Sequence, residues 1–569
     1  MSDITEPPEP TNEVAESGRE LPASPDTLPV VAEMSTKASR VEARWDRVYR
    51  WAGRRGLLKR PIRALIGPSY NRAISRATVE FWSTNDAAEN EKTRLPDNEQ
   101  IALPALWLAE IYTPTTRAGL VRLRDYVALA KLPHRNQDIE RMISSTRLDR
   151  MRVVSPLPWV VPSDSGIFVP ERIVDKLPPR IAHVGLTLLS VTPSITVLVF
   201  EFVLKEEDGL RLNEVINADR ATTIRRTGKT RRSILHVENQ KRGDVAEFRK
   251  SIQKDAENWI RMRVPGFFSE SSSGSFPAIE LLATQLADPF EPNDSTSRPD
   301  PYRDMLDLEN WLGYWRCVDY DYFRLSQSRF DEFLAPRSYR LALAAQMSAL
   351  ADNRLPHTGI GTTNHEILSA AIQAIGAWLP ALLSRWALTA LLSEVDRYLS
   401  LLRDEAMASM GGNSARELIA LRDSLLRVGL DSRIVATEIV EFAAEQDEWE
   451  YGVPDFAFVT HDGRSTESLS SVLRKGQRAT GKRVGQVESD LGELLSTSAD
   501  LTGSVQNLRL QGKVLWLTVV SSIIAIVALG VSLLPYIDSG RHGNSTTPTQ
   551  PPATFAPSVT PTPALPSAT

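Results

Sequence analysis

Residues 514–537 read VLWLTVVSSIIAIVALGVSLLPYI, and these 24 consecutive uncharged residues determine how the chain is held in the cell. A helix of this length covers roughly 36 Å, which is enough to cross a hydrocarbon core about 30 Å thick. Trp516 and Tyr536 stand near its two ends, where aromatic side chains are typical of the membrane–water interface. The stretch therefore predicts one C-terminal transmembrane helix.

The residues on either side of this stretch indicate its orientation. Arg509 and Lys513 precede it and Arg541 follows it, so the positive-inside bias is two against one. Residues 1–36 carry eight acidic residues, one arginine and no apolar run, so we expect no signal peptide. We therefore expect a cytoplasmic N-terminal bulk and a C-terminal tail outside the plasma membrane, with the lipid bilayer as a partner.

The composition is that of an ordinary globular chain. The 569 residues are 42% hydrophobic and 24% charged, and the single cysteine suits a reducing cytosol. The 66 basic and 71 acidic residues give a net charge of −5, which argues against a nucleic-acid partner. Arginine outnumbers lysine by 53 to 13, a ratio that suggests a GC-rich, bacterial coding sequence.

Shifts in composition divide the rest of the chain. Strand-like and helix-like runs alternate before a polar stretch at 288–301, and helical periodicity dominates after it. The predicted fold class is an α+β cytoplasmic domain followed by a helical domain, a membrane-proximal coiled-coil stalk and one C-terminal transmembrane helix. The predicted boundaries are a disordered acidic segment at 1–36, basic amphipathic helices at 37–80, the α+β domain at 81–300, the helical domain at 301–463, the stalk at 464–513, the transmembrane helix at 514–537 and a disordered tail at 538–569.

Two further apolar stretches bear on how many times the chain crosses the membrane. Residues 181–200 are rich in β-branched residues on both sides of a turn at 192–194, which predicts a buried hairpin. Residues 367–384 are interrupted by Pro380, which predicts a buried helix pair bent before the proline. A further alternative, a component of a cation channel or transporter, requires that one of these two stretches also crosses the membrane.

A heptad repeat of apolar residues precedes the transmembrane stretch. The apolar positions alternate three and four apart, as in helices that supercoil around one another, with Ser498 as the one polar core position. The predicted oligomerisation residues are Val484, Val487, Leu491, Leu494, Leu501, Val505 and Leu508. We expect a homo-oligomer joined by this stalk, and the alternative is one amphipathic helix lying on its own domain.

A basic segment with tryptophans lies at 40–76, where 11 basic residues accompany two acidic ones. Such a segment is typical of binding to an anionic inner leaflet, at about 1 kcal/mol per basic residue close to the surface. The candidates for membrane-surface contact are Arg44, Arg47, Trp51, Arg54, Arg55, Lys59 and Arg60. The alternative is that the aromatic face of the segment packs on the domain that follows, while the arginines stay in solvent.

Four glutamates line one stripe of a predicted helix, because they are spaced three, four and three residues apart. They are Glu438, Glu441, Glu445 and Glu448. We interpret them as a solvated helix face, and the alternative is a contact with an ion or a protein partner.

Sequence motifs for catalysis or cofactor binding are incomplete in this chain. The TGKT at 227–230 lacks the glycine that a phosphate-binding loop needs five positions before Gly228, and His365 has no second histidine four positions on. We expect no cofactor and no metal. The leading hypothesis is an oligomeric scaffold or interaction module for unidentified protein partners, and the alternative is a membrane-tethered enzyme with a site in 81–300 that no motif reveals.

Overall fold

The computed structural model describes residues 44, 47, 79–131, 137, 139–140, 154–165, 171–227, 231–271, 275–286, 290, 301–306, 308–309, 313–320, 322–328, 339–352, 363–410, 432–445, 453–460 and 465–538. Contacts divide the chain into two units. The first is Met1–Glu405 with Asp423–Leu491, and the second is Ala406–Arg422 with Gly492–Thr569.

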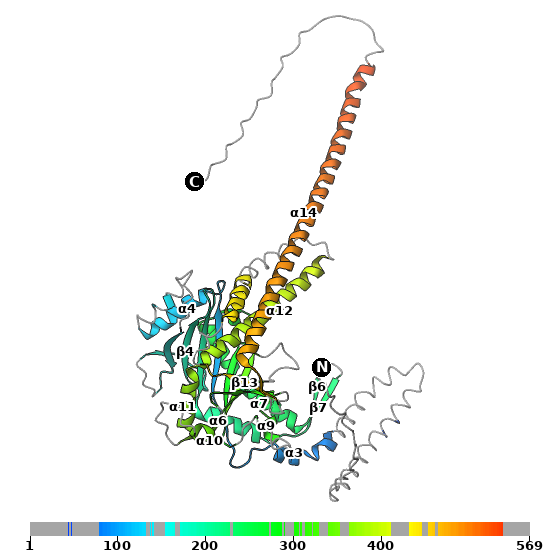
Figure 1. The fold of residues 1–569 in the computed structure, drawn as a ribbon. Coiled ribbons are helices and arrows are strands. Elements are labelled where there is room, and N and C mark those ends of the chain that lie inside the picture. Colours follow the sequence, from blue (N-terminus) through cyan, green and yellow to red (C-terminus); the bar gives the residue numbers. More distant parts are fainter. Residues whose placement is uncertain are drawn as a thin grey trace, which may run out of the picture. The chain divides into compact units, whose positions relative to one another are not determined.

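A 12-stranded sheet forms the centre of the first unit (Figure 1). From one edge to the other its strands are β14 (Ser465–Ser468), β13 (Phe456–Thr460), β10 (Gly313–Cys317), β11 (Phe323–Ser328), β12 (Arg340–Gln346), β8 (Ala278–Thr284), β1 (Ile101–Tyr112), β5 (Thr196–Leu204), β4 (Ile181–Ser190), β2 (Val154–Val161) and β3 (Arg172–Val174), while β9 (Leu308–Glu309) pairs with β11. Among the described strands, only β12 with β8 and β2 with β3 pair in parallel. A separate hairpin joins β6 (Thr223–Thr227) to β7 (Arg231–Leu235).

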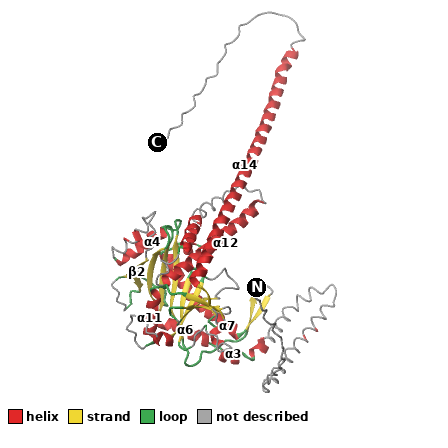
Figure 2. Cartoon of the chain, viewed as in Figure 1, coloured by secondary structure: helices red, strands yellow, loops and turns green. Residues whose placement is uncertain are grey.

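The central strands are long apolar runs because both of their faces are covered. Every residue of β8 is buried, and in β1 only Pro104 is partly exposed. Such runs are typical of strands that lie between two layers of helices. Figure 2 shows the strands of the sheet enclosed by helices.

One face of the sheet is covered by α7 (Val237–Arg263), as the amphipathic pattern of this segment predicts. Trp259 of α7 makes edge-to-face contacts with Phe200 and Phe202 of β5. The helices that contact α7 are α3 (Asp86–Lys92), α4 (Ala118–Val127), α6 (Glu206–Asn217) and α8 (Phe267–Glu270). We name this side of the sheet the α7 face.

The opposite side carries α11 (Asn364–Gly376) and α12 (Leu379–Met410), and we name it the α11–α12 face. Glu201 alternates along β5 with the two phenylalanines that meet α7, so it points to this side. A Cβ atom built on Gly376 would lie 3.0 Å from Glu201 Oε2, which places the end of α11 against the sheet. The two helices meet at an angle of 60°, so the predicted bend before Pro380 is confirmed.

A helix at 432–444 and the start of α14 (Leu469–Asp538) extend the same layer. Gly481 of α14 lies against Val440, where an added Cβ would come within 2.6 Å of a methyl group. Gln477 donates a hydrogen bond of 2.8 Å to the carbonyl oxygen of Arg385 in α12. The first part of α14 is therefore an integral part of the first unit.

The remaining short elements connect these layers. They are η2 (Ala128–Ala130), α9 (Pro301–Asp304) and α10 (Met347–Asp352). The last of these follows β12 directly and contacts α11.

The predicted hairpin at 181–200 is confirmed. β4 and β5 pair in antiparallel register from Ser190 with Thr196 back to Ile181 with Leu204. The turn between them is closed by a hydrogen bond of 3.1 Å from the Val191 amide to the Ile195 carbonyl oxygen. The stretch is therefore apolar because its two strands lie in the interior of the sheet, and not because it crosses a membrane.

The prediction of a helical domain at 301–463 is wrong in two places. The three strands β10, β11 and β12 lie within 313–346, and β13 and β14 follow the helix at 432–444. Aromatic and leucine residues recur in 311–327 at steps that suit a helix, but their side chains also favour a strand wherever a sheet edge is available. Because β12 pairs with β8 over seven residues, the sheet continues across the boundary predicted at 288–301.

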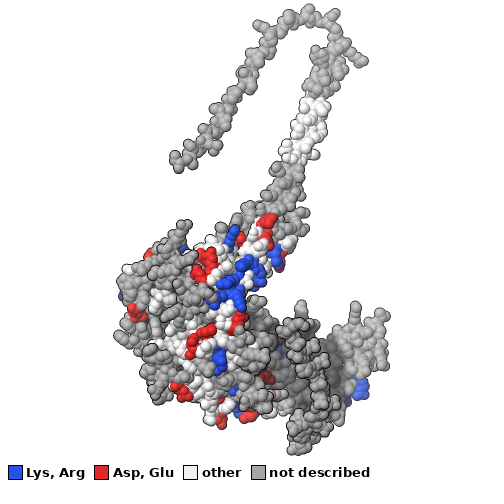
Figure 3. Space-filling view, in the orientation of Figure 1, with Lys and Arg blue, Asp and Glu red and all other residues white. Residues whose placement is uncertain are grey.

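In the second unit the described structure is the end of α12 and the part of α14 beyond residue 491. α14 is one helix of 70 residues. Its segment Gln511–Ala528 has a mean hydropathy of 1.7 and none of it is buried, so it is long and apolar enough to cross a membrane. Figure 3 shows an uncharged stretch on the visible face of this helix.

The bent pair α11–α12 passes the same test of length and composition when it is taken as one span. Unlike those of Gln511–Ala528, most of its apolar side chains are buried within the protein, and Ile375, Leu379 and Leu383 are fully buried. The segment Gln511–Ala528 is therefore the single candidate membrane anchor, among the described helices, whose apolar side chains have no protein contact to bury them.

Candidate functional site

A cavity of about 120 Å³ lies at the end of the sheet where β1 begins and where β5 and β8 end. Two helices start at its rim. α6 begins at Glu206 directly after β5, and α11 begins at Asn364 after the capping residue Thr363. Thr363 accepts a hydrogen bond from the Glu366 amide while the Glu366 side chain accepts one from the Thr363 amide, and this reciprocal cap fixes the first turn of α11.

The floor of the cavity is apolar. Its side chains come from strands at this end of the sheet and from three helices, and they include Ala102, Leu210, Ala283, Met347 and Leu368. Pro104 of β1 also lines it, and because proline has no amide hydrogen the register of β1 against β8 shifts between Ala102 and Ala105. The local sequence of β1 therefore shapes this end of the cavity.

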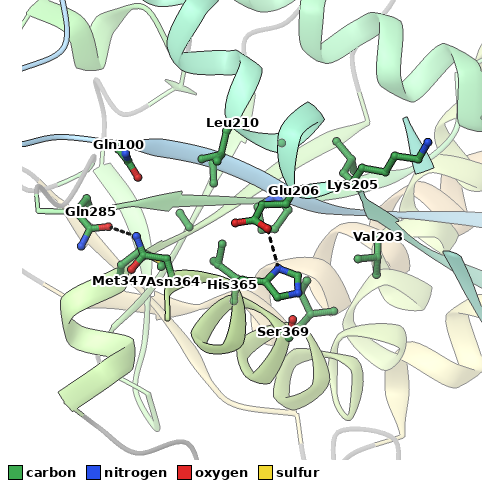
Figure 4. A pocket seen from close by; sticks show the side chains of 17 residues that line it. Gln100, Val203, Lys205, Glu206, Leu210, Gln285, Met347, Asn364, His365 and Ser369 are labelled. Atoms are coloured by element: carbon green, nitrogen blue, oxygen red, sulfur yellow. Dashed lines mark hydrogen bonds and ion pairs between the residues drawn. The ribbon is translucent and has the colours of Figure 1, made fainter. Parts of the chain in front are cut away.

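The rim of the cavity is polar. Asn364 Nδ2 donates a hydrogen bond of 3.0 Å to Gln285 Oε1, and His365 Nδ1 lies 3.6 Å from Glu206 Oε2. Figure 4 shows both pairs at the opening, while the ammonium group of Lys205 points away from them. His365 and Glu206 are 62% and 58% exposed, so both can contact a solute.

The sheet also holds a half-buried glutamate on the α11–α12 face. Trp107 Nε1 of β1 donates a hydrogen bond of 3.0 Å to Glu201 Oε2 of β5. Burial raises the pKa of Glu201 to about 7, although the indole hydrogen bond opposes this shift. Glu201 is therefore a carboxyl group that changes its protonation state near neutral pH.

A second buried glutamate, Glu110, holds the short helix α8 against β1. Its carboxylate accepts hydrogen bonds from the amides of Phe268 and Ser269, at 2.7 and 3.0 Å, and from the Ser269 hydroxyl at 2.6 Å. Burial raises the pKa of Glu110 to about 7, against the opposing effect of these hydrogen bonds. Its contacts are those of a helix-capping residue.

The third buried glutamate, Glu280 of β8, lies on the α7 face between two arginines. Arg249 of α7 and Arg340 of β12 both bind its carboxylate, and all three side chains are essentially inaccessible to solvent. Burial alone would raise the pKa of Glu280, but the two guanidinium groups outweigh it and lower the pKa below its usual value. This cluster is a buried ionic cross-link between a helix and two strands.

Sequence reasoning missed these three glutamates although a signal was present. Each is the only charged residue in its strand, within IALPALWLAEIY, TVLVFEFVL and AIELLAT. A charge inside an otherwise apolar strand must find a partner or lose its charge, because an unpaired buried charge is strongly disfavoured. The sequence does not reveal which of the two happens.

The structure describes two of the seven predicted membrane-surface residues. Arg44 and Arg47 are exposed helical residues. The others, Trp51, Arg54, Arg55, Lys59 and Arg60, lie outside the described residues, and their contact with a membrane stays a prediction.

The predicted oligomerisation residues divide into two groups. Val484 and Leu491 are 0% and 2% exposed within the first unit, and Val487 is half-buried. The side chains of the others, Leu494, Leu501, Val505 and Leu508, lie outside the described residues although the helix continues through them. Val484 and Leu491 are therefore already buried within one chain.

Of the four glutamates predicted on one helical stripe, Glu438 has contacts within the chain. It accepts a hydrogen bond of 3.0 Å from the Ser194 amide and one of 2.7 Å from the Ser194 hydroxyl, at the turn between β4 and β5. Glu441 and Glu445 are exposed, and Glu448 lies outside the described residues. Within the described part of the chain, no three His, Cys, Asp or Glu side chains come close enough together to hold a metal ion.

The basic TGKT stretch lies between two paired strands. β6 ends at Thr227 and β7 begins at Arg231, so a strand follows where a phosphate-binding loop would be followed by a helix. Comparison with known proteins gives no assignment, because no family model and no curated protein matches this chain. Its function is therefore argued from its own residues.

Proposed function

We propose that this protein is a cytoplasmic interaction module that is anchored in the plasma membrane by the C-terminal part of α14 and associates with further copies of itself. The observation that carries the anchor is the exposure of Gln511–Ala528. Nine large apolar side chains between Val514 and Val527 are each at least half exposed. Burying a side chain of this kind is favourable by about 1.5–3 kcal/mol, so leaving nine of them in water would be strongly disfavoured.

The distribution of these side chains favours lipid over a protein groove. A helix that binds a groove needs an apolar stripe on one side and keeps polar residues on the other. Here the consecutive residues Leu515, Trp516 and Leu517 are all exposed and, at about 100° per residue, point to three different sides of the helix. Every residue from 514 to 528 is uncharged. An apolar surface on all sides fits hydrocarbon, where the helix satisfies all of its backbone hydrogen bonds internally.

The test of the anchor replaces three of these residues by arginine. We expect the full chain to remain in membranes washed with alkaline carbonate, and the Val519→Arg, Ile523→Arg, Val527→Arg variant to be released. The matched control places arginines at three exposed apolar positions of the first unit, Leu129, Leu401 and Ile434, and should stay with the membrane. Release of the unmodified chain, or retention of the Val519, Ile523 and Val527 variant, would contradict the anchor.

The orientation is tested on the same membranes. A cysteine at position 545, on a Cys317→Ser background, should react with an impermeant maleimide on intact cells if the tail is outside. Cys317 is buried, so its replacement removes a slow background reaction without changing the surface. Labelling only after the cells are opened would reverse the proposed orientation.

Self-association is proposed to use the heptad positions beyond residue 491. Val484 and Leu491 are buried in the first unit, so substituting them would disturb folding as well as association. The informative variant is Leu494→Asp, Leu501→Asp, and its control, Ser496→Asp, Gln506→Asp, adds the same charge at outward-facing heptad positions. In detergent, light scattering should give a monomer mass for the first variant and the oligomer mass for the control; equal masses would exclude this interface.

A further inference from the structure

The cavity between α6 and α11 has the dimensions of a site for one small apolar group. Its volume of about 120 Å³ is of the same order as the ~150 Å³ cavities that hold a single aromatic ring in other proteins. Its floor, with Ala102, Ala283, Met347 and Leu368, offers no charge to such a group. A ring or branched chain of roughly six non-hydrogen atoms would fill it.

The charge at the opening is negative. Glu206 is the one carboxylate and Lys205 the one ammonium group among the residues that line the cavity. Lys205 points away from the opening in Figure 4, and the one described arginine of α6, Arg211, is paired with Asp208 at 3.4 Å. A positively charged group is therefore favoured at the rim, and a negatively charged group is disfavoured.

The start of α11 is partly satisfied within the chain. The Glu366 amide donates to the Thr363 hydroxyl and the Thr363 amide donates to the Glu366 carboxylate, so these two amides are not available to an anion. The amide pair Asn364–Gln285 adds hydrogen-bonding groups of both kinds beside the opening. The site thus combines an apolar floor, one carboxylate and neutral polar groups.

We propose that this cavity binds a small amphipathic primary amine, with its ring or branched chain on the floor and its ammonium group on Glu206 beside His365. An ammonium donates three hydrogen bonds, and the carboxylate oxygens of Glu206 can accept them at the rim. A ligand of six to nine non-hydrogen atoms binds with a Kd on the order of 1 mM or below. Because all of these residues belong to the first unit, the proposal is independent of the membrane anchor.

The test compares three probes that share one apolar body: 3-methylbutylamine, 3-methylbutan-1-ol and 3-methylbutanoate. Each is titrated into the full chain in detergent micelles by ligand-observed NMR, with empty micelles as the blank. We expect saturable binding of the amine, at least tenfold weaker binding of the alcohol and no binding of the carboxylate. Equal affinity for amine and alcohol, a preference for the carboxylate or no binding of the amine at 10-fold the expected Kd would each overturn the proposal.

Two variants assign the binding to this cavity. Glu206→Gln should weaken binding of the amine at least tenfold and leave binding of the alcohol unchanged. Glu207→Gln, in the same turn but outside the lining, should leave the affinity for both probes unchanged. Leu368→Trp, at a half-buried lining position, should abolish binding of both by filling the floor. Unchanged amine affinity in Glu206→Gln would overturn the assignment, and since Glu206 is exposed this variant needs no repacking to fold.

Discussion

Each face of the sheet carries a glutamate, and the pKa values of these two glutamates are shifted in opposite directions. On the α7 face, Glu280 contacts two guanidinium groups and its pKa is lowered. On the α11–α12 face, Glu201 accepts a hydrogen bond from the indole of Trp107, and burial raises its pKa to about 7. Glu280 is fully buried and Glu201 only half-buried, so the available partner, and not the degree of burial, decides which carboxyl group is charged.

This difference gives the two faces different properties. The α7 face is held by a charged cluster whose ionisation persists over the ordinary pH range. The α11–α12 face contains a group that titrates near neutral pH, beneath the end of α11 where Gly376 approaches Glu201. We therefore expect the contact of α11 with the sheet at Glu201 to depend on pH.

The largest expected effect is the loss of an arginine from the cluster. Arg249→Met leaves Glu280 with one arginine and removes a donor to the Leu306 carbonyl, so it should lower the free energy of unfolding by about 3–5 kcal/mol. Urea unfolding of the full chain in detergent measures the change. The control is Lys250→Met at the next, exposed position, expected within about 0.5 kcal/mol of the unmodified chain. Equal stability of the two variants would show that the cluster is dispensable.

The second prediction concerns the pH dependence of the α11–α12 face. The pKa of Glu201 is about 7 in the folded chain against a usual 4.5, so the folded state binds the proton more tightly. Its contribution to stability is complete below pH 4.5 and is lost as the pH rises through 7, by at most about 3 kcal/mol. Glu201→Gln removes this dependence, so the variant should gain stability relative to the unmodified chain between pH 5 and pH 8.

Unfolding midpoints at the two pH values, for both proteins, isolate this contribution. Glu110 also has a raised pKa and changes stability in the same direction, but it is present in both proteins and cancels from the comparison. Glu207→Gln, which replaces an exposed carboxylate, serves as the control. A Glu201→Gln variant that retains the full pH dependence of the parent would show that another group is responsible.

The sequence predicts those parts of this fold whose partners are near in the chain. The hairpin of β4 and β5 and the bent pair α11–α12 are local, and both were predicted from turn residues and a proline. β10 to β12 were mistaken for helices because their pairing with β13 and β8 depends on residues far away in the chain. For the same reason the cluster around Glu280 was missed, since Arg249 and Arg340 are 31 and 60 positions from it.

The candidate cavity could not be predicted from the sequence, for a related reason. His365 and Glu206 meet across the rim although 159 positions separate them, and neither belongs to a recognisable motif. By contrast, the capping box of Thr363 and Glu366 is a purely local pattern. The distinction is between contacts that one helix makes with itself and contacts that need the assembled sheet.

The smallest expected effect tests that local pattern on the α11–α12 face. Thr363→Ala removes the hydroxyl that accepts the Glu366 amide, and it should lower the free energy of unfolding by about 1 kcal/mol, several times less than Arg249→Met. Thr363→Ser keeps the hydroxyl, so it should lower the free energy of unfolding by only a few tenths of the change expected for Thr363→Ala. If Thr363→Ala and Thr363→Ser are equally stable, the contacts of α11 with the sheet alone hold its first turn. A measurable difference would instead mean that this cap positions Asn364 and His365 at the cavity before any ligand arrives.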